Sequence, residues 1–123
     1  MTAKIIDGKA IAGQVLEDVG KRAEALKERG VTPGLAVILV GDDPASQVYV
    51  RAKGKKCEAM GFFSQIHRLP ADSPQDKVAE LIGELNADVR IHGILLQSPV
   101  PDHMDENTLV CLIDPRKDVD GFH

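Results

Sequence analysis

Tyr49 and Lys53 are the residues of this chain whose types and spacing best suit chemistry. Residues four positions apart in a helix lie on one face, so both side chains can reach the same site. A lysine kept neutral by burial and by nearby positive charge can act as a general base, and Arg51, Lys55 and Lys56 could supply that charge. The ring of Tyr49 offers a flat surface for a planar heterocycle. This pair is therefore the first candidate for a site.

Each candidate also has an ordinary structural interpretation. Charge runs usually mark solvated helix faces, so from the residues alone a solvated lysine is favoured over a base at about three to one. Tyr49, the only tyrosine, could equally be an interior residue with a hydrogen-bonded hydroxyl. Gln97 follows an apolar run, where its amide could serve a site or satisfy a turn. Asp118 and Asp120 would point the same way in an extended chain, either to bind adjacent N–H donors of a heterocycle or as surface acids.

A strand and a helix must position the tyrosine and the lysine. Residues 35–40 form a short apolar run between glycine-containing turns, which predicts a buried strand. Asp43 suits an N-cap and Pro44 the first helical position, and Gly61 is expected to end the helix. The helix is predicted to bury an apolar stripe with the tyrosine–lysine pair at its rim. This stripe consists of Ala45, Val48, Ala52 and Ala59.

Further strands are predicted over residues 62–69 and 89–96, the second too continuously apolar for a sheet wetted on one face. Further helices are predicted over residues 8–29, 74–86 and 105–113. Ser73 is the expected N-cap of the second of these, with Pro74 at its first position. Alternating strands and helices imply right-handed crossovers. The sequence therefore predicts an α/β fold, a three-layer domain with a parallel sheet and helices on both faces.

Ligands of such sheets gather outside the carboxyl ends of the strands. The segment that carries Tyr49 and Lys53 follows one strand and Gln97 follows another, so these three residues are expected near one crevice. The same argument does not place Asp118 or Asp120.

Composition limits the classes of function. With 123 residues, 43% of them hydrophobic, the chain is one globular domain. A net charge of -4 argues against a nucleic-acid or anionic-membrane partner. The chain has neither a signal-peptide pattern nor an apolar run near the roughly 20 residues that span a bilayer, so a cytoplasmic location is expected. Cys57 and Cys111 suggest reduced thiols, and the scattered histidines predict no metal.

The chain contains no pattern typical of a dinucleotide site. The glycine-containing turn after the first predicted strand, residues 41–44, lacks the spacing G-x-G-x-x-G and carries two acids that disfavour phosphate. We therefore expect NADP and related cofactors not to bind these residues.

Several segments occur together in a fixed order: residues 34–37, 40–41, 44–50 with Lys53, 92–95 with Gln97, and 117–123. Together they resemble the bifunctional methylenetetrahydrofolate dehydrogenase/cyclohydrolase family over essentially the whole chain. This resemblance favours Lys53 as a base over Lys53 as a solvated lysine. In that family a first domain carries folate and the catalytic lysine, and a second, Rossmann-type domain carries NADP. Residues 1–123 are similar to the N-terminal folate-binding catalytic domain, and the NADP domain is expected to be absent from this chain.

The resemblance implies roles for individual residues. Lys53 is similar to the catalytic lysine and Gln97 to its hydrogen-bond partner. Substrate-binding roles are implied for Tyr49, Asp120, Ser46 and Pro99. Of these, the tyrosine ring would pack on the aminobenzoate part of folate and the aspartate would hold the pterin.

The implied activity is NADP-dependent oxidation of 5,10-methylenetetrahydrofolate to methenyltetrahydrofolate, then hydrolysis to formyltetrahydrofolate, in one-carbon metabolism and purine biosynthesis. The full-length protein would be a homodimer, and these 123 residues alone would lack dehydrogenase activity. A non-catalytic folate-binding or structural module is the alternative. Gly54, Lys56 and Ser98 depart from the family pattern and could alter the field around the lysine or the wall of the pocket.

Overall fold

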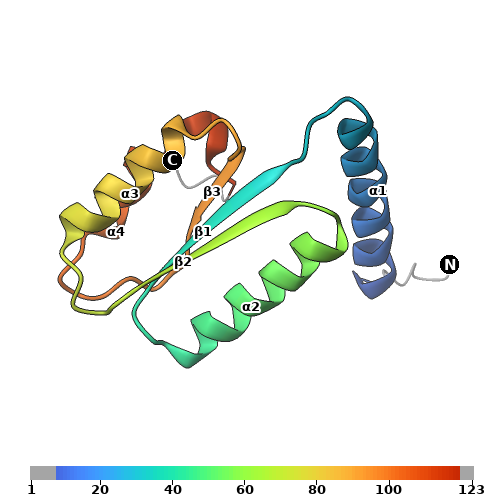
Figure 1. The fold of residues 1–123 in the computed structure, drawn as a ribbon. Helices are drawn as coiled ribbons and strands as arrows, with labels where there is room; N and C mark the ends of the chain where they lie inside the picture. Colours follow the sequence, from blue (N-terminus) through green and yellow to red (C-terminus); the bar gives the residue numbers. More distant parts are fainter. Residues whose placement is uncertain (1–7, 120–123) are drawn as a thin grey trace, which may run out of the picture.

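A parallel three-stranded sheet forms the centre of the molecule. The computed structural model describes residues 8–119, with side chains from residue 14 onward. Strand β1 (Gly34–Val40) lies between β2 (Phe63–Leu69) and β3 (Gly93–Leu96), and both neighbours run parallel to it (Figure 1). The parallel sheet predicted from the sequence is confirmed.

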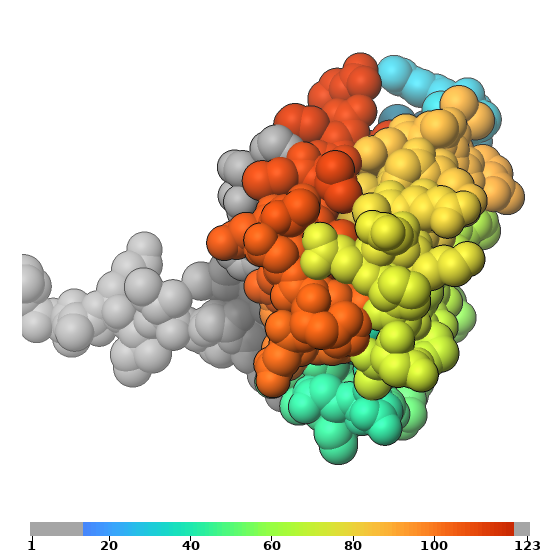
Figure 2. All heavy atoms as spheres, turned by 90° about the vertical axis from the view of Figure 1, so that its left-hand side faces the viewer, coloured from blue at the N-terminus to red at the C-terminus, as the bar shows by residue number. Residues whose placement is uncertain are grey.

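Helices cover both faces of this sheet. Helix α2 (Pro44–Ala59) lies on one face, and α3 (Gln75–Ala87) and α4 (Glu106–Leu112) lie on the other (Figure 1). Figure 2 shows α3 and α4 side by side over their face. A short 3-10 helix, η1 (Pro115–Lys117), follows α4. The three-layer α/β architecture is therefore confirmed.

The side chains of β1 alternate between two hydrophobic clusters. Ala36, Ile38 and Val40 pack toward α3 and α4, whereas Val37 and Leu39 pack toward α2. Because both faces of the strand are covered, its sequence is continuously apolar rather than alternating.

The ends of α2 are set by local sequence, as predicted. The Asp43 carboxylate accepts a hydrogen bond from the main-chain N–H of Ser46 at 2.9 Å, and Pro44 begins the helix. After the helix, Gly61 has a φ of 74°, in the left-handed region that favours glycine.

The predicted buried stripe of α2 is wrong. Its members Ala45, Val48, Ala52 and Ala59 are all exposed, with Val48 61% exposed. The face that meets the sheet instead carries Ser46, Val50 and Cys57. On the same face, a Cβ added at Gly54 would lie 3.1 Å from Cδ1 of Ile66 in β2. The helix therefore lies close to the sheet at Gly54, and it buries a different face from the one that the apolar stripe predicted.

The predicted N-cap of α3 is also wrong. Pro74, with ψ of 147°, occupies the cap position, and the helix begins at Gln75 without a side-chain capping bond. The main-chain carbonyl of Ser73 lies 2.8 Å from Nε2 of His103. Ser73 therefore takes part in a contact between segments that are far apart in the chain. A capping rule based on neighbouring residues does not predict such a contact.

Strand β3 begins later than predicted. Residues 88–92 form a turn, and Val89 is 88% exposed. Asp88 accepts hydrogen bonds from the main chain and the guanidinium of Arg90, which lowers the pKa of its carboxyl to about 2. This ion pair closes the turn and keeps the apolar residues around it out of the sheet.

Helix α1 (Gly8–Glu28) forms where the sequence predicts it but covers neither face of the sheet (Figure 1). Among its described side chains only Ala23 is buried, and Val15 and Leu26 are exposed. A Cβ added at Gly20 would lie 3.3 Å from Sδ of Met60, just after α2, so α1 packs beside the end of that helix. No helix in the described part of the chain is long and apolar enough to cross a bilayer.

Lys117 is expected to stabilise the fold by capping α3. Its Nζ donates to the main-chain carbonyls of Leu85, Asn86 and Asp88 at 3.2, 2.8 and 3.0 Å. Carbonyls at a helix C-terminus carry partial negative charge and favour a cation. We therefore expect Lys117→Met to lower the free energy of unfolding by about 1–3 kcal/mol in urea denaturation. Lys77→Met, at an exposed position of α3, is the control, and an equal loss in both variants would contradict the capping role.

Candidate active site

Lys53 and Gln97 meet at the carboxyl ends of the strands. Lys53 lies on α2, which follows β1, and its Nζ donates a hydrogen bond to Oε1 of Gln97 at 2.8 Å. Gln97 directly follows β3, and its main-chain N–H donates to the carbonyl of Ile38 in β1 at 2.9 Å. Lys53 is half-buried rather than solvated. The topology thus brings these two residues together, as the sequence led us to expect.

The loop after Gln97 is fastened to α2. The main-chain carbonyl of Ser98 accepts hydrogen bonds from Nε2 of Gln97 at 3.2 Å and from Oγ of Ser46 at 3.1 Å. Ser46 is 2% exposed, so its hydroxyl lies inside the α2–sheet contact. The peptide bond between Ser98 and Pro99 is cis, and Pro99 is exposed. The amide of Gln97 therefore has a partner for its oxygen and another for its nitrogen, which fixes its orientation.

A hollow of about 420 Å³ lies beside Lys53 on the α2 side of the sheet. Its walls include the apolar side chains of Leu35, Phe62, Leu95 and Val119. An apolar cavity with a few polar groups is the usual form of a small-molecule site. This hollow is therefore the candidate substrate site.

The segment that leads to Asp120 runs along the free edge of β3. Asp118 forms a parallel β-bridge with Ile94, and a Cβ added at Gly93 would lie 2.6 Å from Cγ1 of Val119. Glycine at position 93 thus lets Val119 pack against the strand. Asp120 itself lies outside the described residues, but its neighbour Val119 lines the same hollow as Lys53.

Tyr49 lies one turn before Lys53 on α2 and is 60% exposed. The alternative that it is an interior residue is therefore wrong.

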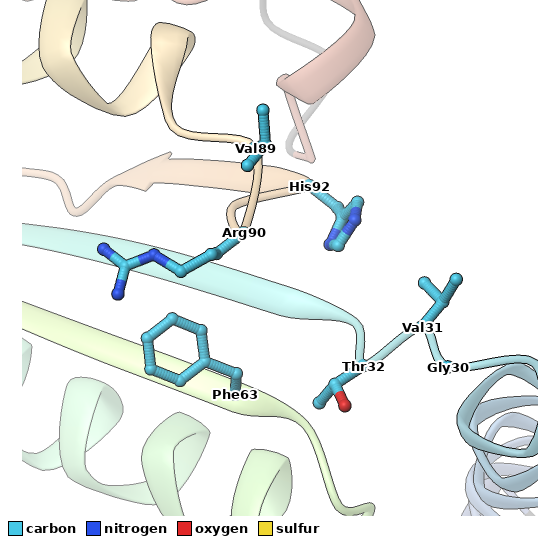
Figure 3. A pocket seen from close by; sticks show the side chains of 7 residues that line it. All are labelled: Gly30, Val31, Thr32, Phe63, Val89, Arg90 and His92. Atoms are coloured by element: carbon cyan, nitrogen blue, oxygen red, sulfur yellow. The ribbon is translucent and has the colours of Figure 1, made fainter.

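A second hollow, of about 580 Å³, lies at the amino ends of the strands (Figure 3). It is lined by Gly30, Val31, Thr32, Phe63, Val89, Arg90 and His92. In it the Arg90 guanidinium lies over the Phe63 ring, 5.4 Å from the ring centre, and is paired with Asp88. Of the described candidate residues, Lys53 lines the α2-side hollow, and none lines this second one.

Other reactive groups offer little chemistry. Burial raises the pKa of the Cys57 thiol, which keeps it protonated and a poor nucleophile. Within residues 14–119 no three His, Cys, Asp or Glu side chains are grouped so as to hold a metal ion. At the start of α2 the Asp43 carboxylate already occupies the Ser46 N–H, so this helix end does not suit a phosphate.

A family model described as the catalytic domain of tetrahydrofolate dehydrogenase/cyclohydrolase matches residues 6–120. The chain belongs to this family. The chain is 53% identical over 122 residues to the bifunctional protein FolD of Moorella thermoacetica, covering 99% of this chain and 44% of the relative. It is 55% identical over 127 residues to FolD of Phenylobacterium zucineum, covering 100% of this chain and 42% of that relative.

Solved structures of bifunctional relatives share the fold. FolD methylenetetrahydrofolate dehydrogenase/cyclohydrolase from Campylobacter jejuni aligns with a TM-score of 0.93 at 44% identity, over 95% of this chain and 42% of that one. FolD of Trypanosoma brucei, complexed with NADP cofactor and an inhibitor, aligns with a TM-score of 0.88 at 35% identity, over 96% and 41%. The chain therefore spans less than half the length of these relatives.

Sequence reasoning missed the walls of the α2-side hollow. Leu35 and Leu95 come from neighbouring strands, and Phe62 and Val119 come from segments outside them. The alternation of side chains along β1 would have placed Leu35 on the same face as Val37. No comparable pattern marks Phe62 or Val119, because their positions depend on where the chain crosses the sheet.

Proposed function

We propose that this chain is the folate-binding catalytic domain of an enzyme that oxidises 5,10-methylenetetrahydrofolate with NADP and hydrolyses the resulting methenyltetrahydrofolate to formyltetrahydrofolate. The observation that carries the proposal is the 2.8 Å hydrogen bond between Lys53 and Gln97 beside an apolar hollow. Membership of the family and the bifunctional names of the relatives support it.

Hydrolysis needs a base near the carbon that water attacks. In its neutral form Lys53 donates one N–H to Gln97 and keeps its lone pair for a proton of that water. A bond forms between the water oxygen and the methenyl carbon while Nζ takes the proton. One C–N bond then breaks as the protonated Nζ gives its proton to the leaving nitrogen, the hydroxyl proton of the intermediate passes to solvent, and the formyl group stays on the other nitrogen. Gln97 acts by holding Nζ toward the carbon.

The remaining candidates would bind the substrate. The exposed ring of Tyr49 would pack on the aminobenzoate part of folate, and the Asp120 carboxylate would hold the pterin. Ser46 and Pro99 would shape the wall formed by the loop after β3.

NADP would bind outside the described residues. The cofactor in the Trypanosoma brucei relative supports NADP for the full-length protein. In the proposal a second, Rossmann-type domain holds it, and the full-length protein is a cytoplasmic homodimer.

To test the proposal, the purified full-length protein is added to methenyltetrahydrofolate, and the loss of methenyl absorbance is measured. Turnover that follows enzyme concentration is the expected result. Thermal stabilisation by the folate without turnover would instead favour a binding module, and neither effect would favour a structural role.

Replacement of Asp120 by alanine is expected to raise KM for the folate by about tenfold while kcat changes little. A carboxylate that holds the pterin acts alike in the ground state and the transition state, so its loss affects binding rather than the barrier. Initial-rate kinetics on the full-length variant measure both constants, with the exposed Asp102→Ala as the control. A fall in kcat at unchanged KM would place Asp120 in the reaction itself.

A further inference from the structure

The loop that carries Gln97 has a second attachment, to α4. Oγ of Ser98 donates a hydrogen bond to Oε1 of Glu106 at 2.6 Å. A carboxylate acceptor makes such a bond shorter and stronger than one between neutral groups. Ser98 contacts Ser46 of α2 through its main-chain carbonyl and Glu106 of α4 through its side chain, so the loop is attached to helices on both faces of the sheet.

The anchor on α4 is itself firmly held. Glu106 is the first residue of the helix, directly after the N-cap Asp105, whose side chain accepts from the main chain and the hydroxyl of Thr108. The main-chain N–H of Asp105 donates to Oε1 of Gln75 on α3 at 2.8 Å, and Leu109 is fully buried. The carboxylate of Glu106 therefore projects from a fixed helix end.

The position of Ser98 determines which atom of the Gln97 amide faces Lys53. The Ser98 carbonyl accepts from Nε2 of Gln97, which leaves Oε1 directed at the lysine. If this carbonyl turned away, Nε2 would lose its acceptor and the amide could rotate. Its N–H groups would then face Nζ, where they cannot bond a charged Lys53 and would occupy the lone pair of a neutral one.

We propose that Ser98 and Glu106 are positioning residues for the Lys53–Gln97 pair: their hydrogen bond holds the loop so that the Gln97 oxygen, and not its nitrogen, faces the lysine. This proposal rests on the proposed function for its effect on turnover. The hydrogen-bond geometry itself can be tested without turnover. Neither residue touches Lys53, so both act through Gln97.

The kinetic test compares Ser98→Ala, Glu106→Ala and the double variant in the full-length protein. Each single change is expected to lower kcat for methenyl hydrolysis about three- to tenfold, with KM within about twofold of the unchanged protein. The double variant is expected to be no slower than the slower single variant, because both changes remove one hydrogen bond. Ser98→Thr keeps the hydroxyl and should restore most of kcat, and the exposed Glu80→Gln is the charge control.

The second measurement is NMR of glutamine side-chain amides, with the Gln97 signal identified by its loss in Gln97→Ala. This signal is expected to shift or broaden in Ser98→Ala and Glu106→Ala and to stay in place in Glu80→Gln. The proposal would be overturned if the enzyme hydrolyses the folate and the single variants keep an unchanged kcat. It would also be overturned if the losses in kcat add in the double variant, or if the variants differ from the unchanged protein only by a lower melting temperature. An enzyme without hydrolysis would refute the proposed function, and an unmoved amide signal would still refute the positioning role.

Discussion

Replacement of Lys53 by alanine is expected to abolish methenyltetrahydrofolate hydrolysis while the protein stays folded. General bases contribute about a hundredfold or more to the rate of a reaction. Lys53 lines the α2-side hollow, and its Nζ is hydrogen-bonded to Gln97. Among the described residues, the Lys53 side chain is hydrogen-bonded to Gln97 alone, and it is half-buried. Its removal should therefore leave the hydrophobic core unchanged. A hydrolysis assay and circular dichroism on the full-length variant measure both effects.

Lys55→Ala is the matched control for this experiment. Lys55 lies on the same helix and is exposed, so the variant removes an equal charge without touching the site. Its activity should stay near that of the unchanged protein. If Lys53→Ala retained hydrolysis within about tenfold, the barrier would have risen by only about 1.4 kcal/mol, and another group would have to be the main base.

Replacement of Gly34 by alanine is expected to give the largest loss of stability. A Cβ at this first residue of β1 would lie 1.9 Å from the main-chain carbonyl oxygen of Arg90. The chain crosses closely here because Gly34 O accepts from the N–H of His92 at 2.8 Å, and Gly34 N–H donates to Nδ1 of the same histidine at 2.9 Å. Backbone, unlike a flexible side chain, cannot move aside without breaking these bonds. The free energy of unfolding should fall by about 3 kcal/mol or more.

Gly83→Ala provides the opposite case within the same protein. Gly83 lies in α3, and a Cβ there would meet no atom within 4 Å. Alanine in an open helical position should therefore stabilise the protein by about 0.5–1 kcal/mol. Urea denaturation of both variants separates the two effects. If the free energy of unfolding of Gly34→Ala lay within about 1 kcal/mol of that of the unchanged protein, the Arg90 main chain would not approach Gly34 closely.

Much of the fold follows from local sequence. The apolar run of β1, the cap at Asp43 and the stop at Gly61 were predicted where the structure has them, because each depends on residues that are neighbours in the chain. The alternation of strands and helices then implied a parallel sheet. That topology brought Lys53 and Gln97 to the same edge, and the structure adds their hydrogen bond.

Tertiary contacts decided the rest. Helix α2 buries Ser46 and Val50 while Val48 is exposed, because the packing of the whole helix on the sheet sets which face is turned inward. Strand β3 starts late because an ion pair closes the turn before it. Ser98 and Glu106 meet because α4 packs against α3 and projects its first turn toward the loop. The sequence by itself determined the elements and their order, since hydrophobic periodicity and capping act over a few residues. Only the packed structure determined which side chains share a hydrogen bond, because that depends on distances between segments far apart in the chain.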